Sequence, residues 1–73
     1  MKARLDPQID GTKVEDLRWL KRLTASELAR RAGISRQHLT RIRHNGRDAS
    51  LKVQRAIADV LEVPLEEIQK DQP

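Results

Sequence analysis

Polar side chains between residues 36 and 44 have the types and the spacing needed to hydrogen-bond nucleic acid bases. At about 100° per residue, Leu39 and Ile42 share one side of a helix. The side chains left facing outward are those of Gln37, Thr40, Arg41 and His44, with Arg36 at the flank. A guanidinium can form two hydrogen bonds to guanine, and a carboxamide can form two to adenine. This helix could therefore read bases if neighbouring elements hold it in place.

The residues before this helix predict a second helix and a tight turn. The apolar residues at helical spacing are Leu28, Ala32, Leu39 and Ile42. Ala29 is small where the two helices must cross. Gly33 suits the left-handed end of a helix, Ile34 fills the turn and Ser35 can cap the next helix. The segment from Glu27 to Ile42 is typical of a helix-turn-helix unit.

Length and composition favour one small all-α domain. The chain has 73 residues and no cysteine, so neither a disulfide framework nor a thiolate zinc site can stabilise it. Its apolar residues are mainly Leu, Ile, Val and Ala, which suit a bundle of short helices. No apolar run reaches the length of a membrane span or a secretory signal, so we expect a cytoplasmic protein.

Positive charge is concentrated in the middle of the chain. Residues 18–47 carry nine Lys and Arg against a single acidic residue, Glu27, a net charge of +8, whereas the whole chain carries +4. The two flanking segments are therefore net acidic. This uneven distribution indicates that one side of the molecule faces phosphates.

Capping signals predict where the first three of five helices begin. Thr12 with Glu15 and Thr24 with Glu27 have the spacing of a capping box. The first helix is expected to run to about residue 22, with the apolar residues Val14, Leu17 and Leu20 buried. The third should begin at Ser35, run to about His44 and end in a left-handed turn at Asn45-Gly46.

The remaining helices follow from polar and proline signals. Residues 48–50 precede a fourth helix whose apolar side consists of Leu51, Ile57, Ala58 and Leu61. Pro64 should start a short fifth helix with Leu65 and Ile68 inward. We therefore predict a flexible arm at residues 1–11, a domain at 12–70 and a tail at 71–73.

From Val14 to Ile68 the chain resembles the Cro/C1-type helix-turn-helix domains of phage repressors, the XRE family. The matching residues are Leu17-Arg18, Leu23-Thr24, Glu27-Leu28-Ala29, Gly33-Ile34-Ser35-Arg36, Leu39, Arg41-Ile42, Ser50-Leu51, Ile57-Ala58, Leu61-Glu62-Val63-Pro64-Leu65 and Ile68. The resemblance implies a compact four- to five-helix, lambda-repressor-like fold. It also implies sequence-specific binding of double-stranded DNA by a transcriptional regulator, most simply a repressor.

The same resemblance implies roles for individual residues. The helix at 35–44 would enter the major groove, where the base-contacting residues would be Arg36, Gln37, Thr40 and Arg41. Thr40 could offer its methyl group to thymine or its hydroxyl to a phosphate. The phosphate-contacting residues would be Thr24, Ser35, Arg43, His44 and Arg47. A homodimer would read a two-fold operator, with an interface formed by the last helices, residues 64–70.

Three positions depart from the family pattern. Ala25 occupies the place of a glutamine that commonly holds a DNA phosphate. Many members pair the arginine of the first helix with a glutamate at the end of the recognition helix, but here both positions are arginines, Arg18 and Arg43. Arg18 then needs another acceptor, such as Asp48 or a helix C-terminus, and Arg43 could reach a phosphate. Asn45 replaces the usual glycine after the recognition helix.

Other functions have less support in the sequence. His38 and His44 are six residues apart and so do not share a helix face for a metal, and no residues are arranged for catalysis. We predict no enzyme activity and no cofactor, and we expect Trp19 to cover the edge of the core. One alternative is an antitoxin-like protein-interaction module that uses residues 65–73. RNA binding is disfavoured because the chain lacks Phe and Tyr for stacking on bases.

Overall fold

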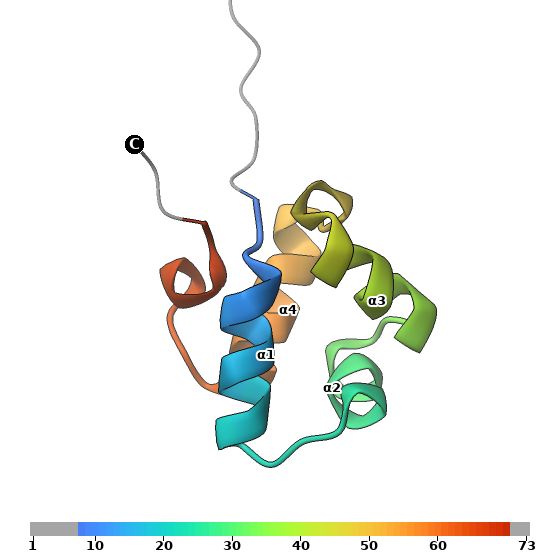
Figure 1. Cartoon of the computed structure of the whole chain (residues 1–73), viewed down its shortest axis with the longest axis vertical. Coiled ribbons are helices and arrows are strands. Elements are labelled where there is room, and N and C mark those ends of the chain that lie inside the picture. Colours follow the sequence, from blue (N-terminus) through green and yellow to red (C-terminus); the bar gives the residue numbers. More distant parts are fainter. Residues whose placement is uncertain (1–7, 71–73) are drawn as a thin grey trace, which may run out of the picture.

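Helices α1 to α4 and two short 3-10 helices, η1 and η2, follow one another in the computed structural model, which describes residues 8–70 (Figure 1). Their bounds are Gly11–Leu20 (α1), Ala25–Ala32 (α2), Arg36–His44 (α3), Gly46–Asp48 (η1), Leu51–Leu61 (α4) and Leu65–Ile68 (η2). The isolated bridge at Ile9 and Gln69 is the only β-type pairing within residues 8–70. The predicted all-α fold is confirmed.

The core lies where the apolar sides of the four α-helices meet. Its largest apolar side chains, all at most 1% exposed, are Ile9, Val14, Leu28, Leu39, Ile42, Ile57, Leu61 and Ile68. Helix α2 packs against both α3 and α4, and α1 packs against α3. Because α2 and α3 each bury one side in this core, the core fixes the position of the helix-turn-helix unit.

The two ends of the described chain pair with each other. The amide of Asp10 donates to the carbonyl of Ile68 at 2.8 Å, and that of Lys70 donates to Gln8 at 2.9 Å. Ile9, between them, is fully buried. Residues 8–11, which we expected in a flexible arm, are therefore packed on the domain, whereas residues 1–7 of that arm and the tail at 71–73 lie outside the described residues.

The first helix differs from the prediction at both ends. Its cap is Asp10, whose carboxylate accepts from the amides of Thr12 and Lys13, so the capping box expected at Thr12 is wrong. The helix ends at Leu20, two residues early, because Arg22 adopts a left-handed conformation with φ of 58°. Leu20, the last residue of the helix, is 78% exposed instead of buried.

Two further differences lie near the ends of α3 and α4. Asn45 is extended, with φ of −140°, so the left-handed turn predicted at Asn45-Gly46 is wrong. Gly46 is required for another reason, since a Cβ there would overlap the backbone carbonyl oxygen of Ile9. The predicted fifth helix is the four-residue 3-10 helix η2, in which Ile68 is fully buried and Leu65 is half-buried.

Candidate nucleic-acid interface

The turn between α2 and α3 has the geometry that the sequence predicts. Gly33 is left-handed, with φ of 78°, and its amide donates to the carbonyls of Ala29 and Arg30. The amide of Ile34 also donates to Ala29, at 3.0 Å, which completes a Schellman-type helix end. Ser35 then begins α3 by accepting a hydrogen bond from the amide of His38 at 2.9 Å. Hydrogen bonds therefore end α2 before the turn and start α3 after it.

Helix α3 buries one side and exposes the other. Leu39 and Ile42 are at most 1% exposed, and small Ala29 of α2, 2% exposed, is buried with them in the core. The four residues predicted to contact bases, Arg36, Gln37, Thr40 and Arg41, are all exposed. The structure thus brings these four side chains together on the outer side of a helix whose inner side is fixed in the core.

Thr40 differs from its neighbours because its hydroxyl already has a partner. Its Oγ1 donates to the carbonyl oxygen of Arg36 at 3.1 Å, one turn earlier in α3. In this rotamer the hydroxyl proton is not available to a phosphate. The methyl group of Thr40 has no such engagement with the backbone, and a threonine methyl suits the C5 methyl of thymine.

The first turns of α2 and α3 present different charges. At the start of α2, Thr24 Oγ1 accepts from the amide of Glu27 at 3.0 Å, and the Glu27 carboxylate accepts from the amide of Thr24 at 2.8 Å. This is the predicted capping box, and its hydrogen bonds hold the pKa of Glu27 below the ordinary value of 4.5. The first turn of α3 has no acidic residue. The exposed end at Ser35 is therefore the more favourable of the two for an anion.

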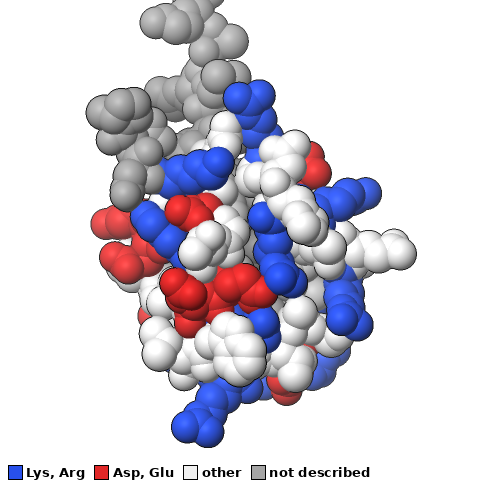
Figure 2. Space-filling model, viewed as in Figure 1, with Lys and Arg blue, Asp and Glu red and all other residues white. Residues whose placement is uncertain are grey.

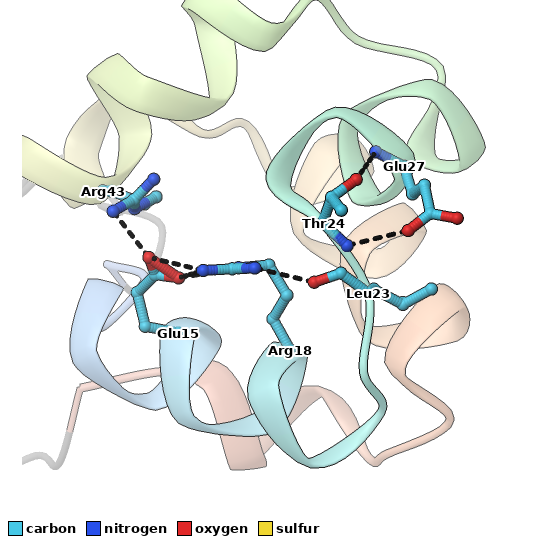
Figure 3. A network of polar contacts seen from close by, with 6 residues as sticks. All are labelled: Glu15, Arg18, Leu23, Thr24, Glu27 and Arg43. Atoms are coloured by element: carbon cyan, nitrogen blue, oxygen red, sulfur yellow. Dashed lines mark hydrogen bonds and ion pairs between the residues drawn. The ribbon is translucent and has the colours of Figure 1, made fainter.

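Arg18 and Arg43 meet at a carboxylate that the sequence analysis assigned elsewhere (Figure 3). Glu15 Oε1 accepts from Arg18 Nε at 2.7 Å, and Glu15 Oε2 lies 2.5 Å from Arg43 Nη2. Arg18 Nη1 donates to the carbonyl of Leu23 at 2.6 Å. The acceptors of Arg18 are thus Glu15 and Leu23, which lies between α1 and α2, and not the suggested Asp48 or the last carbonyls of a helix.

The remaining candidates lie at the C-terminal end of α3. Arg43, His44 and Arg47 are exposed, and the amide of Arg47 donates to the side chain of Asn45 at 3.1 Å. His38 is half-buried, with Nε2 3.3 Å from the carbonyl oxygen of Asp48. Arg47 and His44 therefore flank the exposed side of α3, whereas His38 lies at its boundary with the core.

Figure 2 shows that charge is unevenly spread over one face of the molecule. Red side chains gather on the left half, over α1 and η2, and blue side chains predominate on the right half, over α2 and α3, with further blue side chains among the red ones and at the bottom edge. Trp19 is 71% exposed, so the expectation that it covers the core edge is wrong. The guanidinium of Arg18 lies 5.5 Å from the centre of its ring.

Within residues 8–70, no group of three or more His, Asp or Glu side chains could hold a metal ion.

No helix among the described residues combines the length and the apolar character needed to cross a bilayer. A search of curated proteins found no match to this chain. A helix-turn-helix family model, by contrast, matches residues 14–68. That match spans α2, the turn and α3, together with the core helices that support them. The chain therefore belongs to the Cro/C1-type, or XRE, family of helix-turn-helix DNA-binding regulators.

Proposed function

We propose that this protein is a transcriptional repressor that recognises a specific sequence of double-stranded DNA with α3 in the major groove. The observation that carries the proposal is the outward cluster of Arg36, Gln37, Thr40 and Arg41 on a helix whose opposite side is buried. Because the helix backbone is held in place by the core, its long polar side chains can reach base edges while the backbone stays fixed. A protein bound to an operator can repress transcription simply by occupying that DNA, so DNA binding alone is enough for repression.

Each exposed side chain of α3 suits a different part of the DNA. Arg36 and Arg41 can each form paired hydrogen bonds with guanine, and Gln37 can do so with adenine. Thr40 suits a thymine methyl group. The hydroxyls of Thr24 and Ser35 accept from backbone amides, so their protons remain to donate to phosphate oxygens. The cationic phosphate contacts would be Arg43, His44 and Arg47.

A homodimer on a two-fold operator fits this surface best. A single domain with four base-reading side chains offers few specific contacts, and two copies would double them on half-sites about 34 Å apart. The C-terminal segment around η2 is the dimer surface that we favour. Glu66 and Glu67 are exposed there, and their charge would keep this end away from phosphates.

A second candidate is a protein-interaction module in which DNA binding is secondary. The observation in its favour is the exposure of two adjacent apolar side chains, Trp19 at 71% and Leu20 at 78%. Exposed apolar side chains of this size can form part of a docking surface. A protein that copurifies with the wild type and is lost with Leu20→Gln would favour this candidate.

Selection of bound duplexes from a random pool tests the proposed function. We expect a motif with two-fold symmetry and half-sites one helical turn apart. Structured RNA added at equal concentration should leave the selected duplex bound. If RNA displaced the protein, or if no sequence were enriched, the proposal would be abandoned.

A further inference from the structure

We propose that Glu15 is a positioning residue for DNA recognition, a role that rests on the proposed function. Its carboxylate holds the end of α3 against α1 and, through Arg18, holds α3 in register with the start of α2 (Figure 3). Glu15 lies on α1, outside the helix-turn-helix segment. It would act by fixing the helix that touches the bases.

Arg43, the second-last residue of α3, lies against α1. Gly11 and Glu15 are one turn apart on the same side of α1, and both meet Arg43. A Cβ at Gly11 would overlap the backbone carbonyl oxygen of Arg43, so the two backbones are in direct contact. The side chain of Arg43 reaches Glu15 Oε2 at 2.5 Å. Both the backbone and the side chain of this residue are therefore held by α1.

Arg18 links Glu15 to the segment that precedes α2. Arg18 binds Glu15 through Nε and Nη2, each 2.7 Å from Oε1, and its Nη1 donates to Leu23, the residue before the cap of α2. A continuous series of contacts thus joins Arg43, Glu15, Arg18 and Leu23. These contacts tie the end of α3, the helix that carries the base-reading side chains, to the start of α2.

The charges of Glu15, Arg18 and Arg43 do not cancel. Two guanidinium groups share one carboxylate, so the cluster keeps a net positive charge, and its side chains are 14% (Arg18), 23% (Glu15) and 35% (Arg43) exposed. Without the carboxylate, the two guanidinium groups would lose the anion that they share, and their like charges would repel each other. Glu15 therefore allows Arg18 and Arg43 to remain together beside the DNA-facing side.

The test compares two binding constants for Glu15→Gln: one for the duplex selected by the wild type and one for an unrelated duplex. Loss of positioning should weaken the specific complex about tenfold, within the range of coupling seen among residues of one ion-pair network. Removal of a negative charge should leave the unrelated complex unchanged or tighter. The specificity ratio should therefore fall about tenfold. A merely structural role would weaken binding to both duplexes by the same factor and leave the specificity ratio unchanged.

Asp16→Asn is the matched control, because it removes the same charge from the exposed neighbouring position of α1. Its specificity ratio should equal that of the wild type. If Glu15→Gln does not fold, Glu15→Asp keeps the charge but is too short to hold both arginines, and its ratio should also fall. An unchanged ratio in the folded Glu15 variant would overturn the inference and leave the proposed function intact. A wild type that selects no duplex would overturn both.

Discussion

Arg41 and Gln37 are the side chains whose removal should have the most specific effect. Alanine at either position should cost about 1–3 kcal/mol of binding free energy and relax the preference at one base position. Arg55→Ala is the control, since it removes an exposed arginine from α4. Binding measured on duplexes with single base changes checks this. A loss of equal size on every duplex would assign the residue to the phosphate backbone instead.

Residue-level rules predicted most of the caps, and they failed where two residues competed. Thr24, Ser35 and Gly33 have the roles that their types and positions indicate. At the first helix, Thr12 and Glu15 fit a capping box as well as Thr24 and Glu27 do. Asp10 takes the cap because the pairing of residues 8–10 with 68–70 places it at the helix start. Local spacing could not reveal that distant pairing. Nor could it reveal the contact of Glu15 with Arg43, whereas the contact with Arg18, three residues further along α1, was open to it.

At the scale of elements, two glycines should respond differently to substitution. Gly33 is left-handed with open space around it, so Gly33→Ala should cost about 1–2 kcal/mol of stability, and Gly33→Asn should cost less. At Gly46, a Cβ would meet the backbone of Ile9, so Gly46→Ala should cost about 1–3 kcal/mol, and Gly46→Asn at least as much. Urea unfolding of the four variants measures these costs. Equal rescue by asparagine at both sites would contradict the assignment.

The capping box of α2 should make stability depend on pH. Because folding lowers the pKa of Glu27, its contribution is present above the unfolded value near 4.5 and is lost as pH falls through the lower folded value. The stability difference between wild type and Glu27→Gln should therefore be largest at neutral pH and shrink in acid. Glu62, whose pKa is lowered by Lys21, is present in both proteins and cancels. A difference independent of pH would contradict this account.

The helix-turn-helix unit could be predicted from the sequence because each of its determinants is local. Periodicity marks Leu39 and Ile42, and single residues end and start the helices. Other predictions failed where distant contacts decide the outcome. Position 46 requires glycine because the backbone of Ile9, 37 positions earlier, leaves no room for a Cβ. The end of α1 at Leu20 goes with a left-handed conformation at Arg22, which few residues other than glycine adopt and which no local signal predicts.

At the scale of the whole molecule, a buried glutamine joins α4 to the C-terminal segment. Gln54 is fully buried, its Nε2 donates to the carbonyl of Ala49 at 3.1 Å, and its Oε1 accepts from Gln69 at 3.0 Å. Its spacing from Ile57 and Leu61 places it in the apolar stripe of α4, a signal that the sequence analysis did not use. Its polar side chain is tolerated there because Ala49 and Gln69 supply partners.

Gln54→Leu should therefore destabilise the domain although it adds an apolar side chain to the core. The backbone carbonyl of Ala49 and the side-chain Nε2 of Gln69 would each lose a hydrogen-bond partner. We expect this to lower the free energy of unfolding by about 1–3 kcal/mol. Gln69→Ala, which leaves the bond to Ala49 in place, should cost less. Thermal and urea unfolding compare the two variants. A Gln54→Leu protein as stable as the wild type would show that the network contributes specificity of packing rather than stability.

The most direct test of the central claim, that the exposed side of α3 contacts DNA, is the amide spectrum of isotope-labelled protein titrated with its selected duplex. The account predicts the largest chemical shift changes at residues 35–41, with smaller ones at residues 24–25 and 43–47. Amides of residues 65–70 should change only if the protein dimerises on the DNA. Shift changes concentrated in α1 and η2, with the amides of α3 unchanged, would contradict the account.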